Sequence, residues 1–156
     1  MTAPLVIWLE ISHHAAFRMG GWAYVRSDGI EVTGQAGGDR RVEAERAALQ
    51  GLIAALKAQP ARLHTASALV EAIPARIAAA QAGDNPPTEN LDLWAQAMKA
   101  LAASPVQMLR AVPAPDSPTA FAAAWADLAR DKARDKGPFT SAIPKPNLAK
   151  LKLRGP

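Results

Sequence analysis

The sequence contains no cysteine, and this absence removes several kinds of chemistry at once. Without cysteine there is no disulfide bridge, no thiolate nucleophile and no zinc or iron–sulfur site with sulfur ligands. The chain has only three histidines, which leaves little material for a zinc site built from protein side chains alone. The lack of cysteine fits a reducing compartment, and we expect a cytoplasmic protein.

Long hydrophobic runs are also missing. No apolar segment approaches the roughly 18–20 residues that a membrane-spanning helix needs. The first four residues lack the basic region and the apolar stretch of a secretory signal. We therefore expect no membrane partner. A chain of 156 residues, 49% of them hydrophobic, is long enough for one domain with a true core.

Positive charge is scarce over most of the chain and concentrated at its end. Residues 1–129 hold ten Lys and Arg against twelve Asp and Glu, whereas residues 130–156 hold eight against two. The last twenty residues also contain four prolines. We expect a folded domain over residues 1–136 and a mobile basic tail over residues 137–156. Such a tail favours contact with a polyanion or an acidic surface.

The pattern of apolar residues predicts alternating strands and helices. Short β-rich runs predict strands over 6–9, 21–26, 30–34, 62–66 and 106–112. Helical spacing predicts a helix over 41–57, with Asp39 as its N-cap. A short helix from Ser67 to Ile73 and another beginning at Pro74 are expected next. Two further helices would carry Leu91 to Leu101 and Phe121 to Leu128. The order β-β-β-α-β-α-α-β-α favours a mixed five-stranded α/β sheet with helices on both faces. Strands one to three would form an antiparallel meander, and strands one, four and five would be parallel neighbours.

Five local strings, in this order, resemble type 1 ribonuclease H. They are Gly20-Gly21-Trp22-Ala23, Arg41-Val42-Glu43-Ala44, Thr65-Ala66-Ser67, Asn90-Leu91-Asp92-Leu93-Trp94 and Asp127-Leu128-Ala129-Arg130. The resemblance spans roughly residues 5–135 and leaves the tail outside it. It implies a ribonuclease-H-like fold, and the family's activity is cleavage of the RNA strand of an RNA–DNA hybrid with two Mg²⁺ ions.

The resemblance also implies four carboxylate ligands, of which this chain retains two. Glu10 stands at the position of the family's first-strand Asp, and Glu43 stands at that of its first-helix Glu. Ala66 and Ala126 replace the Asp after strand four and the Asp of the last helix. Because Mg²⁺ demands strict octahedral oxygen geometry, two carboxylates, one of them lengthened, would hold Mg²⁺ or Mn²⁺ weakly if at all.

Other parts of the family pattern are altered too. The family's Gly-, Asn- and Pro-rich turn is replaced here by residues 11–19, where we take His13 and His14 to be exposed loop residues. Arg41 and Asn90 are retained and, with Arg40, are candidate phosphate contacts. In the tail, the candidate contacts are Lys145, Lys150, Lys152 and Arg154.

Three functions follow as hypotheses. The first is an inactive or very weak ribonuclease-H-like module that binds an RNA–DNA hybrid, DNA or RNA. The second is an active hybrid endonuclease with rearranged metal ligands. The third is a protein-interaction scaffold whose residues 148–153 add a strand to a partner.

Overall fold

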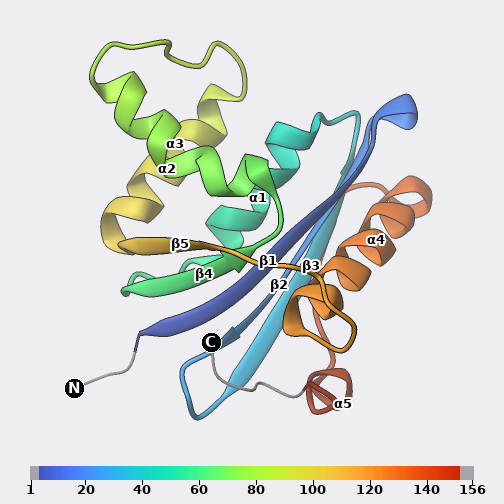
Figure 1. Ribbon diagram of the computed structural model, residues 1–156. Helices are drawn as coiled ribbons and strands as arrows, with labels where there is room; N and C mark the ends of the chain where they lie inside the picture. The colour runs from blue at the N-terminus through green and yellow to red at the C-terminus, as the bar shows by residue number, and fades with distance from the viewer. Residues whose placement is uncertain (1–3, 152–156) are drawn as a thin grey trace.

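The structure, a computed structural model, describes residues 4–151 (Figure 1). Its elements are β1 (Leu5–His14), the 3-10 turn η1 (Ala15–Phe17), β2 (Met19–Ser27), β3 (Val32–Arg40), α1 (Ala44–Ala55), β4 (Ala61–Thr65), α2 (Ala68–Gln81), α3 (Leu91–Ala103), β5 (Val106–Arg110), α4 (Pro118–Lys136), β6 (Phe139–Ala142) and α5 (Lys145–Leu148). None of the helices within this range is both long enough and apolar enough to cross a membrane.

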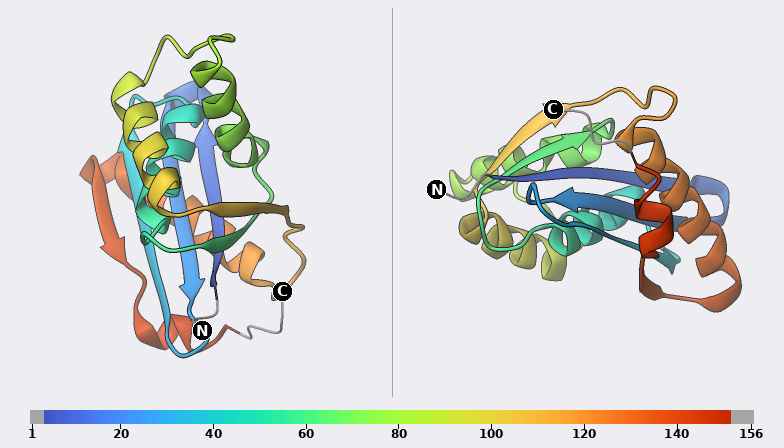
Figure 2. Two further views of the ribbon diagram at one scale, coloured as in Figure 1. Left: turned by 90° about the vertical axis from the view of Figure 1, so that its left-hand side faces the viewer. Right: turned by 90° about the horizontal axis from the view of Figure 1, so that it is seen from below.

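One mixed sheet organises the molecule, with the strand order β5-β4-β1-β2-β3-β6. Strands β1, β2 and β3 pair antiparallel, while β4 pairs parallel to both β1 and β5. These pairings confirm the predicted meander and the predicted parallel neighbours. Helices α1, α2 and α3 cover one face of the sheet and α4 covers the other (Figure 2).

The alternation of side chains along β1 decides what faces each layer. Leu5, Ile7 and Leu9 pack in the core formed with α1, α2 and α3. Trp8 points to the opposite face and joins a second cluster, against which residues of α4 pack. Because successive side chains of a strand point to opposite faces, Glu10 lies on the same face as Trp8. The residue of greatest functional interest therefore faces α4.

Helix α4 lies close to the sheet because the contact is made by small residues. Gly21 of β2 and Gly38 of β3 lie under the backbone of α4, and Ala126 and Ala129 pack against the alanines of the strands. A Cβ atom placed on Gly21 would lie 2.3 Å from the carbonyl oxygen of Ala126. This packing explains why the sequence has glycine at these strand positions.

Several predicted boundaries were wrong. Strand β3 continues through Gly37 and Gly38, beyond the predicted strand end at residue 34, and Asp39 lies within it rather than capping a helix. The N-cap of α1 is Glu43. Pro74 lies inside α2, which runs unbroken around it because Val70 and Ile73 anchor the helix in the core.

The largest correction concerns the predicted mobile tail. Residues Phe139–Ala142 pair antiparallel with β3 and form a sixth strand, so the expected five-stranded sheet is one strand short. Ile143 and Leu148 are buried, and Gly34 leaves the space for both side chains. This segment covers what would otherwise be an open sheet edge. Since Leu148 is buried within α5, the described part of the expected partner-binding strand is already used inside the domain.

If the C-terminal segment belongs to the domain, trimming its anchor must weaken the fold. We expect Ile143→Val to lower the free energy of unfolding by about 1 kcal/mol, because one buried methyl group is lost. Ile30→Val is the matched control, since Ile30 is 96% exposed at the β2–β3 turn and should change nothing. Urea denaturation of both variants measures this, and equal stability of the two would return the segment to the status of a loose tail.

Candidate functional site

Glu10 and Ala66 meet where β1 and β4 run side by side. Glu10 is 5% exposed, and its Oε2 atom accepts a hydrogen bond of 2.8 Å from the backbone N–H of Ala66. Ala66 directly follows β4, so the parallel pairing of the two strands brings the residues together. The juxtaposition of these two positions agrees with the sequence analysis, but only one of them carries a carboxylate.

Burial controls the protonation of Glu10. Loss of solvent raises the pKa of its carboxyl from 4.5 to about 7, and the hydrogen bonds from the Ala66 backbone and the Thr65 side chain oppose this rise. A carboxyl with this pKa is neutral in part of the molecules near neutral pH. The group is therefore a weak cation ligand unless other acids share the site.

Ala126, the other substituted position, lies on the same face of the sheet. It is completely buried on α4 and packs with Ala23, Ala36 and Ala129. Ala23 is the cross-strand partner of Glu10. The helix therefore presents a methyl group, and not a ligand, beside the strand that carries Glu10.

Asp127, the next residue along α4, is engaged in a different contact. Its Oδ1 atom accepts a hydrogen bond from the hydroxyl of Ser12. Arg130 donates a hydrogen bond of 3.0 Å to the same hydroxyl and lies 3.8 Å from the Asp127 carboxylate. The Ser12–Asp127–Arg130 contact ties α4 to β1, and the carboxylate of Asp127 is already paired with a cation.

Glu43 belongs to a separate contact at the start of α1. Its carboxylate accepts a hydrogen bond of 2.9 Å from Nε of Arg18, and both side chains are more than half exposed. Helix α1 packs on the face of the sheet opposite to the one that Glu10 faces. No hydrogen bond within residues 4–151 joins Glu43 to Glu10, so their pairing as metal ligands stays a prediction.

The residues present do not fit the two-ion centre that the resemblance implies. Across residues 4–151, no three His, Asp or Glu side chains lie close enough together to hold a metal ion. Two of the expected ligand positions are alanines, and Glu10 is enclosed by protein. Mg²⁺ and Mn²⁺ need several oxygen ligands in regular geometry, which this site does not supply.

Two of the predicted phosphate contacts, Arg40 and Asn90, make hydrogen bonds within the protein. Nε of Arg40 donates a hydrogen bond of 2.9 Å to the carbonyl oxygen of Ala133, near the end of α4. The side-chain amide of Asn90 donates to Glu45 and accepts from Arg46, and so links α1 to the start of α3. Contact of Arg40 and Asn90 with a phosphate stays a prediction.

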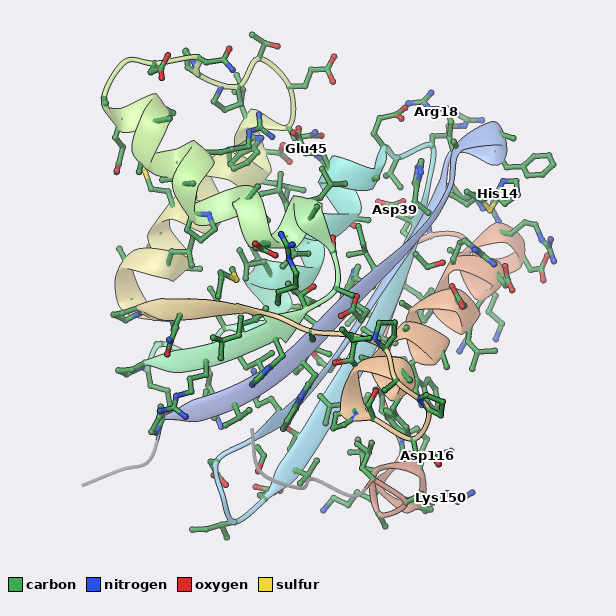
Figure 3. The ribbon with its side chains drawn as sticks, in the orientation of Figure 1. His14, Arg18, Asp39, Glu45, Asp116 and Lys150 are labelled. Carbon is green, nitrogen blue, oxygen red and sulfur yellow. The ribbon has the colours of Figure 1, made fainter. Side chains whose placement is uncertain are left out.

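The remaining predicted contacts that lie within residues 4–151 do not gather into one surface. Lys145 begins α5, and Lys150 lies beside Asp116 and Ser117 in a hollow next to the first turn of α4. Arg41, which is exposed, follows β3 near the other end of α4. Figure 3 shows this separation, with Lys150 and Asp116 at one end of the molecule and Arg18 and His14 at the other. Lys152 and Arg154 lie outside the described residues.

The tip of the β1–β2 hairpin differs from the expectation for this segment. The sequence predicts a loop over residues 11–19, whereas β1 extends to His14 and β2 starts at Met19. Between them His14 and Phe17 stack, with ring centroids 4.8 Å apart. The isolated Phe17 between polar and small residues was the one signal in the sequence that pointed to this feature.

Comparisons with known proteins identify the fold. No protein-family profile and no curated protein matches the sequence. Among solved structures, the chain resembles the N-terminal RNase H domain of Rv2228c from Mycobacterium tuberculosis, solved as a fusion with maltose-binding protein. That match has 20% identity, covers 86% of this chain and 99% of that chain, and has a TM-score of 0.64.

Two further structures give the same result. LC9-RNase H1, a type 1 RNase H with the type 2 active-site motif, matches with 17% identity over 99% of this chain and 88% of its own, at a TM-score of 0.68. RNase H1 from the halophilic archaeon Halobacterium salinarum matches with 22% identity over 84% of this chain and 100% of its own, at a TM-score of 0.57. At such low identities the likeness concerns architecture, and the chain therefore has the ribonuclease H fold.

Proposed function

We propose that this protein is a ribonuclease-H-like module that binds nucleic acid and has little or no nuclease activity. The observation that carries the proposal is the state of Glu10. Its carboxyl is buried against the backbone of Ala66 and faces the alanine-rich side of α4. A two-ion mechanism needs ionised carboxylates on several elements around a shared point. The described residues offer one enclosed acid there.

Two observations support binding of nucleic acid: the fold and the placement of positive charge. The three solved structures compared above are ribonucleases H by name. In this chain, Arg18 and Arg41 lie beside the β1–β2 hairpin tip, and Arg134 and Lys136 occupy the last turn of α4. Contacts with phosphates would make the affinity fall steeply as salt rises.

Purified protein should bind a labelled RNA–DNA hybrid or one of its single strands without cutting it. Fluorescence anisotropy, measured between about 50 and about 200 mM salt, should show affinity that falls at least about ten-fold over that range. Gel analysis of the same hybrid with Mg²⁺ or Mn²⁺ should show intact RNA. Absence of binding to hybrid, RNA and DNA alike would overturn the proposal.

The same gel distinguishes the alternative of an active hybrid endonuclease with rearranged ligands. Asp127 would have to leave Ser12 and Arg130 to serve such a site. Metal-dependent cleavage that disappears in Glu10→Gln and in Asp127→Asn would establish that alternative and replace the non-catalytic reading. A contaminating nuclease would cut equally in the wild-type and variant preparations, and the comparison excludes it.

A further inference from the structure

We propose that the tip of the β1–β2 hairpin is a stacking platform for an unpaired base of single-stranded nucleic acid. The platform consists of His14 and Phe17, with Arg18 and Arg41 beside it. This inference rests on the proposed function, because it names where and in what form the nucleic acid is bound. It also goes beyond the contacts expected from the sequence, since none of those included an aromatic ring.

The two rings form an exposed aromatic surface. Their planes are inclined by 26° with centroids 4.8 Å apart, so they stack. Phe17 is 69% exposed, which is unusual for a phenylalanine in a domain with a well-filled core, and His14 is also exposed. Every nucleobase has a π face, so an exposed ring of this kind can stack with any of them.

The platform stands on paired strands. The pairing of β1 with β2 continues to the last residue pair before the turn, His14 with Met19. A ring nitrogen of His13 lies 2.8 Å from the carbonyl oxygen of Val42. The backbone N–H of Val42 donates in turn to the carbonyl oxygen of Arg18, at 3.0 Å. The hairpin is therefore tied to the segment that leads into α1. We expect binding to cost little conformational entropy in the turn.

Two arginines lie beside the platform, on the side of α1. The guanidinium of Arg18 contacts the carbonyl oxygen of Arg41, and Arg41 is exposed. Glu43 pairs with Arg18 and neutralises part of this charge. A phosphate placed beside Arg18 would share the guanidinium with Glu43 or displace that exposed carboxylate, which surface ion pairs permit at small cost.

A second group of cations comes from α4. The backbone of Arg130 lies against Gly21, the third residue of β2 after the turn. The helix ends with Arg134 and Lys136 in its last turn. The end of α4 and the hairpin tip lie at the same end of the molecule in Figures 1 and 2. Acidic residues also line this stretch of helix, and Asp131 and Asp135 pair with Arg130 and Arg134. Arg18 and Arg41 are the cations next to the rings, and Lys136, in the last turn of α4, is a further candidate contact for a phosphate.

The geometry favours an unpaired base over a regular duplex. Inside a duplex, each base is covered on both faces by its neighbours, so an exposed ring can reach only an end or a base that leaves the stack. The platform is a short turn at the end of two strands, which suits a flexible single strand that can wrap around it. A single-stranded segment next to a hybrid, or a free single strand, offers this chemistry.

The test compares two exposed hydrophobic residues at opposite ends of β2. Anisotropy titrations would use a labelled single-stranded RNA of about a dozen nucleotides, the same DNA sequence, and the blunt hybrid of the two. Phe17→Ala should weaken single-strand binding about ten-fold and change hybrid binding less than two-fold or so. Phe17→Trp should keep the affinity, because a larger ring stacks as well. Ile30→Ala, at the far turn, should bind as wild type does.

Each result leads to a different conclusion. If wild type binds but Phe17→Ala and Ile30→Ala bind equally well, the stacking platform is wrong and the proposed binding function stands. If wild type binds no nucleic acid at all, both fail together. If wild type binds no nucleic acid but dimerises in a Phe17-dependent manner in sedimentation velocity, the exposed ring serves a protein contact and the inference is overturned. Circular dichroism of each variant establishes that the fold is unchanged.

Discussion

Gly21→Ala is expected to lower the free energy of unfolding by about 3 kcal/mol or more. The added Cβ atom would lie 2.3 Å from the carbonyl oxygen of Ala126 and 2.5 Å from the backbone nitrogen of Arg130. Both atoms belong to the backbone of α4, so no side-chain rotation relieves the clash. The helix has to move away from β2 and open its packing against the sheet. Urea denaturation followed by circular dichroism measures the loss.

Gly20→Ala is the matched control on the neighbouring residue. There the new Cβ would lie 2.9 Å from a methyl group of Val42 and 3.2 Å from Cβ of Ala47. Part of this crowding is relieved by a small movement of the Val42 side chain, so we expect a loss of about 1 kcal/mol. A Gly20→Ala loss as large as that of Gly21→Ala would show that the close approach of α4 is not the reason for glycine at position 21.

These glycines also explain where sequence-based prediction of the fold succeeded and failed. The order of the first five strands and four main helices follows from periodicities that depend on one face of each element being buried, as in Leu49, Leu52 and Leu63. Within their own segment, Gly37 and Gly38 are typical of the end of a strand. Their role is to let a helix from another part of the chain come close, and that requirement is not visible within the segment itself.

The sixth strand was not predicted, for a related reason. Residues 139–142 are polar in part and lie between prolines, so local propensity favours an irregular tail. What orders them is the open edge of β3 and the space that Gly34 leaves for Ile143 and Leu148. Both belong to a segment more than a hundred residues earlier in the chain. Composition therefore gave the correct charge of this region and an incorrect view of its structure.

Some features of the candidate site could likewise be predicted from the sequence, and others could not. The sequence alone showed that Ala66 and Ala126 have no ligand atoms, because that is a property of residue type. It could not show that Glu10 is buried or that Glu43 faces Arg18, since both depend on which face of the sheet each element covers. The stacked pair of His14 and Phe17 was missed because the length of β1 was underestimated, which placed both residues in a loop.

Burial of Glu10 has a consequence for stability that can be measured directly. The folded-state pKa of about 7 lies above the ordinary value of 4.5, so the folded protein binds the proton more tightly than the unfolded chain does. The stability contributed by the neutral carboxyl is fully present below pH 4.5 and is lost as the pH rises through 7. The difference between the two pKa values corresponds to about 3 kcal/mol, most of it lost between about pH 4.5 and about pH 7.

Glu10→Gln should remove this dependence, because the amide has the same shape, can still accept the N–H of Ala66 and does not ionise. We expect the variant to match wild type near pH 4 and to exceed it by about 3 kcal/mol near pH 8.5. Glu43→Gln, at an exposed acid, is the control and should follow the wild-type curve. Denaturation at both pH values with and without Mg²⁺ completes the experiment. If Mg²⁺ restores wild-type stability near pH 8.5 and leaves Glu10→Gln unchanged, Glu10 is an ionised metal ligand, and the non-catalytic proposal loses its main support.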